Sequence, residues 1–243
     1  GGNRFRDAGA ACLAQLLTMN ESIVHLSLKS NDIGHDGGSA LAAALEENRT
    51  LTSLDLGGIS GINRNHLGMA GSAAMGQMLA VNQVLAYLNV SSNGLGAEGI
   101  KLLAQGLKYE DGGNTVYNTT VVSVNFSGNN LRSEGCEYLG DALEGTRLEY
   151  LDLQRNAMGD RGIIHIAHGL RLGTSICDTL TELLLDSNGI KELGCKALGK
   201  YIRGSARLKI LSLNDNALGS GMQHLMDAFK ENRSLLEMRC CHY

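Results

Sequence analysis

The chain has 243 residues, of which 43% are hydrophobic, and a formal net charge of −4 at pH 7. This length and composition can bury a substantial core, but the charge provides no basic footprint for nucleic acid and no polybasic membrane patch. We therefore expect that the protein binds neither nucleic acid nor a membrane. No apolar run is as long as a membrane span and no signal-peptide pattern opens the chain, which predicts a cytoplasmic protein.

The composition also indicates repeats. Pro and Trp are absent, and aromatic residues make up only 4% of the chain. Large aromatic side chains supply much of the buried area of an ordinary core. A core without them must be built from many equivalent aliphatic layers. The six cysteines form no C-x-x-C pair and no regular spacing, which favours reduced thiols over disulfides.

One segment recurs along the chain with the pattern L-x-x-L-x-L-x-x-N-x-L. Copies occupy residues 23–34, 85–96, 121–131, 148–159, 180–190 and 208–219. The asparagines that anchor the copies are 27 to 36 residues apart, which fits a unit of about 28 residues interrupted by insertions. The alternating leucines of L-x-L predict a short strand with one buried face.

The second half of each unit predicts a helix. A glycine lies six residues after the asparagine in nearly every copy, and apolar residues follow four and eight positions later, as in Leu41 and Leu45. That spacing places them on one side of a helix. Residues 1–243 are therefore predicted to form one domain, an α/β solenoid shaped like a horseshoe. About eight units of about 28 residues stack, with a parallel sheet on the concave face and helices on the convex face.

The repeated asparagines are interpreted as structural, because the turn after each strand leaves backbone groups that a buried amide can satisfy. They are Asn31, Asn65, Asn93, Asn129, Asn156, Asn188 and Asn216. The segment 94–99 matches the dinucleotide pattern G-x-G-x-x-G, but Gly96 and Gly99 are ordinary positions of the repeat. We therefore expect no cofactor.

The repeated unit, L-x-x-L-x-L-x-x-N-x-L-G-x-x-G-x-x-x-L-x-x-x-L, resembles the ribonuclease-inhibitor-like class of leucine-rich-repeat proteins over essentially the whole chain. This class includes the ribonuclease inhibitor, the repeat domains of NOD-like receptors, Ran GTPase-activating proteins and ciliary scaffolds. The resemblance implies a non-catalytic scaffold that binds a protein partner, in the cytoplasm or associated with the cytoskeleton or a cilium. The alternatives are a Ran-type GTPase-activating protein, whose acidic tail and catalytic arginine find no match here, and the ligand-sensing arm of an innate immune receptor.

The repeat pattern also predicts where a partner binds. Side chains that flank the strand leucines face the concave surface, which becomes acidic with apolar interruptions in its second half. Tyr87 and Tyr150 are the strongest candidates for anchors, because rigid aromatic residues dominate interface energetics. The predicted concave contacts are Tyr87, Asn89, Tyr150, Asp152, Glu182, Leu184, Asp186 and Ile210.

Three insertions at 57–64, 108–120 and 172–179 provide an alternative surface, since repeat insertions form loops that often bind partners. Arg64, Tyr109 and Tyr117 are the candidate contacts. Tolerated surface loops are an equally good interpretation.

No catalytic set is visible, so we predict a protein that is not an enzyme. His165 and His168 lie three residues apart on a predicted helix, but no third ligand is identifiable nearby, and we expect no metal.

Cys240 is expected in the core of a further repeat that begins at Leu235. The chain opens within a unit, without Met, and neither end shows a polar cap. We therefore expect flanking sequence, or end-to-end stacking of copies.

Overall fold

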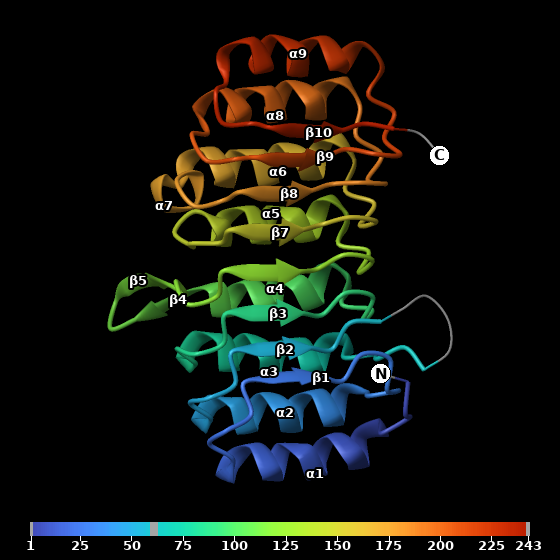
Figure 1. Ribbon diagram of the computed structural model, residues 1–243, viewed down its shortest axis with the longest axis vertical. Helices are drawn as coiled ribbons and strands as arrows, with labels where there is room; N and C mark the ends of the chain where they lie inside the picture. Colours follow the sequence, from blue (N-terminus) through green and yellow to red (C-terminus); the bar gives the residue numbers. More distant parts are fainter. Residues whose placement is uncertain (1, 59–62, 242–243) are drawn as a thin grey trace.

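The computed structural model describes residues 2–58 and 63–241, and in this part of the chain strand–turn–helix units stack along a single axis (Figure 1). The first and last units lie at opposite ends of the stack. Part of the insertion predicted at 57–64 lies outside the described residues.

The helices cover one side of the stack. Their bounds are α1 (Arg6–Met19), α2 (His35–Glu47), α3 (Gly68–Val81), α4 (Gly96–Leu107), α5 (Arg132–Leu143), α6 (Gly159–Leu172), α7 (Thr174–Cys177), α8 (Glu192–Gly204) and α9 (Met222–Glu231). From α2 onwards, each helix except the short α7 follows a strand, and α1 to α6, α8 and α9 each pack beside the helix of the neighbouring unit.

The strands form an eight-stranded parallel sheet on the other side, in the order β1-β2-β3-β6-β7-β8-β9-β10. Their bounds are β1 (His25–Ser27), β2 (Ser53–Asp55), β3 (Tyr87–Asn89), β6 (Ser123–Asn125), β7 (Tyr150–Asp152), β8 (Glu182–Leu184), β9 (Ile210–Ser212) and β10 (Glu237–Arg239). Neighbouring strands lie about 4.8 Å apart, whereas packed helices need about 8–10 Å. The sheet must therefore occupy the concave side, and the predicted solenoid is confirmed.

The core lies between the sheet and the helices, as the leucine pattern predicts. The middle residue of each central strand points inward, and Leu88, Val124 and Leu151 are at most 2% exposed. The helices contribute the residues predicted four and eight positions after the glycine, such as Leu103 and Leu107, both fully buried. These residues belong to one continuous hydrophobic cluster.

The asparagines after the strands link successive units. The Asn65 Oδ1 atom accepts from the backbone N–H groups of Asn31 and Ile33, each at 3.0 Å, and its Nδ2 donates to the carbonyls of Leu28 and Leu56, each at 2.9 Å. Asn129, Asn156, Asn188 and Asn216 make equivalent bonds. The interpretation of this ladder as structural agrees with these contacts.

Asn93 departs from this pattern. Its Nδ2 donates to the carbonyls of Leu56 and Ser91, at 2.8 and 3.0 Å, but its buried Oδ1 has no partner among the described residues. In other units this atom accepts from the preceding asparagine's N–H. The preceding unit here carries the insertion at 57–64, so its turn is not equivalent to the others.

A second asparagine ladder, which the sequence analysis missed, closes the other end of the units. The Asn48 Nδ2 donates to the Leu17 carbonyl at 2.8 Å, and its Oδ1 accepts from the N–H groups of Thr50 and Leu51. Asn82, Asn118 and Asn232 make equivalent bonds where their helices return to the sheet. The available signal was spacing, because Asn48 and Asn82 follow Asn31 and Asn65 of the first ladder by 17 residues each.

Two of the predicted insertions contain regular structure. Residues 108–117 form an antiparallel hairpin of β4 (Lys108–Asp111) and β5 (Asn114–Tyr117), which projects from the stack (Figure 1). Gly112 and Gly113 make its two-residue turn with φ of 56° and 81°, the left-handed pair that a tight hairpin requires. The insertion at 172–179 contains α7, a single helical turn.

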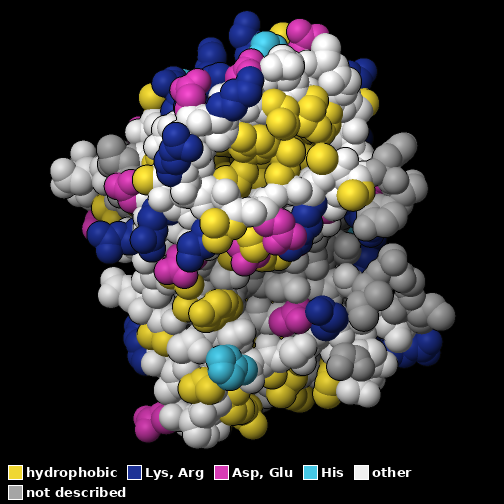
Figure 2. Space-filling view, turned by 45° about the horizontal axis from the view of Figure 1, so that its top comes forward, with side chains coloured by type: hydrophobic (Ala, Val, Ile, Leu, Met, Phe, Trp, Pro, Cys, Tyr) yellow, Lys and Arg dark blue, Asp and Glu magenta, His cyan; other side chains and the backbone are white. Residues whose placement is uncertain are grey.

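The C-terminal end of the stack exposes apolar side chains, and Figure 2 shows a hydrophobic patch in the upper part of the molecule, below a rim of charged side chains. Leu236 is 79% exposed and Met226 is 45% exposed. The prediction that Cys240 is a core residue is wrong, because the side chain is exposed. It occupies a core position of the repeat, but no described unit packs over it.

Helices α5 and α6 approach each other through glycines. A Cβ atom on Gly169 would overlap the carbonyl oxygen of Gly140, and a Cβ on Gly140 would lie 2.5 Å from the carbonyl oxygen of His165. Gly76 and Gly106 make the same contact between α3 and α4. The absence of side chains therefore sets the distance between these helix pairs.

We predict that Asn156→Ala destabilises the chain more than Asn93→Ala. The first change leaves the Asn129 N–H without its acceptor in a buried turn, whereas the second orphans no donor because the Asn93 Oδ1 is already unpaired. We expect a loss of about 2–3 kcal/mol for Asn156→Ala and about 1 kcal/mol for Asn93→Ala in urea unfolding. The exposed Gln105→Ala serves as control, and equal losses for both asparagines would contradict the assignment.

We also predict that Gly169→Ala is destabilising, although alanine has the higher helix propensity by about 1 kcal/mol. The added methyl group would collide with the α5 backbone at Gly140, and overpacking of this kind costs about 1–3 kcal/mol. Gly204→Ala is the matched control, because nothing lies within 4 Å of its Cβ position. Thermal unfolding should show a lower melting temperature only for Gly169→Ala.

Candidate protein-binding surface

The sheet presents aligned rows of side chains that alternate with the buried strand residues. One row runs across the strands in register and consists of His25, Ser53, Tyr87, Ser123, Tyr150, Glu182, Ile210 and Glu237. The next consists of Ser27, Asp55, Asn89, Asn125, Asp152, Leu184, Ser212 and Arg239. All of the predicted concave residues except Asp186 lie in these two rows, and Asp186 lies two residues after Leu184.

The half of the sheet face formed by β1, β2, β3 and β6 is polar and close to neutral. Serine and asparagine occupy most positions, and Lys29 pairs with Asp55 at 3.2 Å. Tyr87 stands out from these short side chains, since it is 50% exposed. It is therefore accessible as an anchor, as predicted, and a contact with a partner there stays a prediction.

The half formed by β7 to β10 is acidic. Asp152, Glu182, Asp186 and Glu237 contribute four carboxylates. Arg239 is the single cation at the described positions of these rows, and it pairs with Glu237 at 2.7 Å. This half also carries Tyr150 and Ile210, both partly exposed, so apolar and acidic groups alternate across it.

Tyr150 lies on β7, where the acidic half borders the neutral half, and is half-buried beside two carboxylates. Burial raises the pKa of its hydroxyl to about 12, and the negative charges of Asp152 and Glu182 act in the same direction. The hydroxyl therefore stays protonated at neutral pH, and the Asp152 carboxylate is its hydrogen-bond acceptor.

Asp152 is only 5% exposed and already serves the fold. Its carboxylate accepts from the Gln154 N–H at 3.0 Å and from the Asn125 Nδ2 at 2.9 Å. Burial is the largest influence and raises its pKa; Asp186 also raises it, while the bonds from Gln154 act against this. Little of Asp152 is available to a partner.

Asp186 and Leu184 are also committed to the sheet in part. The Asp186 carboxylate accepts from the Ser212 Oγ at 2.6 Å and from the Asn214 N–H at 2.8 Å, and Leu184 is 8% exposed. Tyr150, Glu182 and Ile210 are the partly exposed members of the predicted set in this half. They are the residues that the geometry makes most accessible.

The hairpin holds one of its predicted contacts against the body of the protein. The Tyr117 ring packs on Gly145, and the neighbouring Lys108 pairs with Asp141 of α5 at 2.8 Å. Tyr109 pairs with Val116 on the opposite face of the hairpin, and both tyrosines are partly exposed.

The described residues of the insertion at 57–64 lie at the other edge of the sheet from the hairpin (Figure 1). Arg64 is exposed and lies close to Gly58. The two insertions therefore do not form one continuous loop surface. A partner that touched both would have to cross the sheet face.

The described residues contain no group of three or more His, Cys, Asp or Glu side chains that could hold a metal ion. His165 and His168 therefore have no third ligand there. Burial raises the pKa of Cys136 to about 12 and that of Cys195 to about 11, which disfavours the reactive thiolate at both positions. Within the described chain, no helix combines the length and apolar character needed to cross a membrane.

Comparison with known proteins agrees with the repeat geometry. The sequence model of a leucine-rich-repeat family matches residues 20–42, 81–104, 117–140 and 146–167. The chain is 30% identical to NACHT, LRR and PYD domains-containing protein 12 of Mus musculus, over 87% of the chain and 19% of that protein. It is 29% identical to NACHT, LRR and PYD domains-containing protein 5 of Homo sapiens, over 91% of the chain and 17% of that protein.

A shorter relative carries the likeness as well. The chain is 28% identical to the ribonuclease inhibitor of Mus musculus, over 89% of the chain and 43% of that protein. The unit of strand, asparagine turn and helix thus defines a leucine-rich-repeat protein. The similarity to the ribonuclease inhibitor agrees with the ribonuclease-inhibitor-like class of that family. It spans about a fifth of the length of the NACHT-containing relatives.

We predict that lowering the pH stabilises the wild-type chain relative to Asp152→Asn. The pKa of Asp152 is raised in the folded state, so the folded chain takes up this proton before the unfolded chain does. The wild type should therefore gain stability against the variant as the pH falls from 7 towards 4. Melting temperatures of both proteins across this range test the sign, and a constant difference would show that Asp152 is not perturbed.

Proposed function

We propose that the chain is a non-catalytic interaction module that binds a partner protein through the sheet face of β7 to β9. The observation that carries this proposal is the run of Tyr150, Glu182 and Ile210, which occupy in-register positions on three adjacent strands. An aromatic ring, a carboxylate and an aliphatic side chain thus share one accessible surface. Interfaces draw most of their energy from such anchors, set in a polar surround.

The negative charge of this surface indicates which chemistry a partner's surface would need. Asp152, Glu182 and Asp186 contribute negative potential, and the nearest cation of the rows, Arg239, is engaged by Glu237. A partner surface with basic residues beside apolar ones would complement it and would be steered towards it. The serine-rich half around β3 and β6 carries no comparable charge and can contribute contacts through Tyr87.

A second candidate function is the ligand-sensing repeat arm of an innate immune receptor. The observation in its favour is the similarity to NACHT, LRR and PYD domains-containing proteins across about nine-tenths of this chain. Sequencing the full-length transcript discriminates between a receptor arm and a separate interaction module. The transcript of a receptor would also encode a nucleotide-binding domain. The sheet-face proposal is compatible with either outcome, because it concerns only the repeat surface.

The test compares the wild-type chain with the double variant Tyr150→Ala/Glu182→Arg as bait in native extract, followed by affinity measurement with the purified captured protein. We expect the double variant to weaken that affinity at least tenfold, because loss of a buried aromatic anchor alone costs about 2 kcal/mol. The matched control is Glu137→Arg on the helix side, which should leave the affinity unchanged. Undiminished binding by the double variant would exclude this face as the interface.

A further inference from the structure

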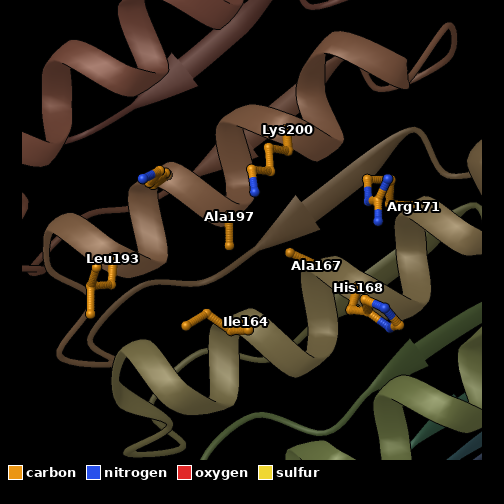
Figure 3. Close-up of a pocket in the computed structure, with 8 residues that line it drawn as sticks. Ile164, Ala167, His168, Arg171, Leu193, Ala197 and Lys200 are labelled. Atoms are coloured by element: carbon orange, nitrogen blue, oxygen red, sulfur yellow. The ribbon is translucent and has the colours of Figure 1, made fainter.

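The helix side of the stack carries a groove whose chemistry is opposite to that of the sheet face. It lies between α6 and α8, has a volume of about 240 Å³ and is shown in Figure 3. The residues that line it are Ile164, Ala167, His168 and Arg171 of α6, and Leu193, Lys196, Ala197 and Lys200 of α8. Among the described residues, no carboxylate lines it.

The floor of the groove is apolar because small residues face each other across it. Ala167 and Ala197 point into the space between the helices (Figure 3), and their short side chains leave it unfilled. Ile164 and Leu193 lie together at one end and are 42% and 60% exposed. Two large apolar side chains thus remain accessible at the same end of a recessed surface.

The rim of the groove is cationic. Arg171, Lys196 and Lys200 are exposed, and among the described residues no ion pair engages any of them. Their positive charges are therefore available to a partner's carboxylates. His168 lies on the same rim beside Arg171 (Figure 3).

The groove is polarised along its length. Ile164 and Arg171 are seven residues apart on α6, as are Leu193 and Lys200 on α8, which corresponds to about 10 Å along each helix. An extended chain covers that distance in about three residues. An apolar side chain at one end and a carboxylate about three residues later would therefore meet complementary groups at both ends.

We propose that this groove binds an acidic linear segment of a partner protein, which inserts an apolar side chain between Ile164 and Leu193 and places carboxylates against Arg171 and Lys200. The volume favours this occupant, because it is smaller than the roughly 300–1,000 Å³ of pockets that enclose small-molecule ligands. It suits one or two side chains. The site is separate from the sheet face, so the chain has two binding surfaces of opposite charge.

The test measures binding of a fluorescein-labelled peptide, Gly-Ser-Leu-Gly-Asp-Glu-Asp-Ser-Gly, to the 243-residue chain by fluorescence anisotropy. Two matched peptides replace the leucine by serine or the three acidic residues by lysine. We expect saturable binding of the first peptide, at least fivefold weaker binding of the serine peptide and no binding of the lysine peptide. Raising the salt concentration should weaken the first interaction, because exposed charges are screened.

Variants of the chain assign the site. Arg171→Glu/Lys200→Glu should weaken binding at least tenfold, and Leu193→Asp at least fivefold, while circular dichroism confirms that these exposed positions leave the fold intact. The matched control is Arg147→Glu/Lys209→Glu, which makes the same change in net charge at exposed positions outside the groove. The sheet-face variant Tyr150→Ala/Glu182→Arg should bind the peptide normally, so this proposal and the proposed function fail separately.

Three outcomes would overturn the groove proposal. Equal weakening by the groove variant and its control would show non-specific attraction to charge. Equal affinity for the leucine and serine peptides would show that the apolar floor is unused. Binding to phosphatidylserine vesicles without binding to the acidic peptide would assign the basic rim to a membrane surface instead.

Discussion

The structure depends on hydrogen bonds that asparagine side chains make to the backbone of the preceding unit. After each strand the chain turns away from the sheet, and its N–H and C=O groups lose their strand partners. The Asn156 side chain satisfies the Asn129 N–H and two carbonyls in one step, and its counterparts repeat this in the neighbouring units. A second set, represented by Asn48, does the same where the helix returns to the sheet. Both ends of the stack's units are thereby held at a constant spacing.

This constraint separates the residues that hold the stack together from those that face a partner. The leucines and asparagines are buried in every central unit. Some positions beside them on the strands, such as Asp152 and Leu184, are buried as well, but the partly exposed ones lie outside the hydrophobic core. Those positions can therefore differ from unit to unit without loss of the fold. Three adjacent strands carry different side chains at such positions, namely Tyr150, Glu182 and Ile210. They give the sheet an acidic surface with apolar anchors.

The two faces of the solenoid carry opposite chemistry for the same reason. Outward positions of the helices are also free of the core, and α6 and α8 place unpaired cations around an alanine floor there. The sheet face and the groove between α6 and α8 lie on opposite sides of the stack and share no residue. One chain can then bring together a basic and an acidic partner, which is a property suited to an interaction module.

The sequence by itself determined the repeating unit, the inward leucines, the order of strand and helix and the rows of side chains on the sheet, because each follows from periodicity within a single unit. It also assigned the first asparagine ladder through its repeated position. Only the tertiary structure decided that Asp152 is buried by bonds to Asn125 and Gln154, that Tyr117 packs on Gly145, and that residues 108–117 form a hairpin. The groove between α6 and α8 is of this kind too. Its lining comes from two units about 29 residues apart, and the space between two helices depends on which side chains meet across it, which no pattern within one unit specifies.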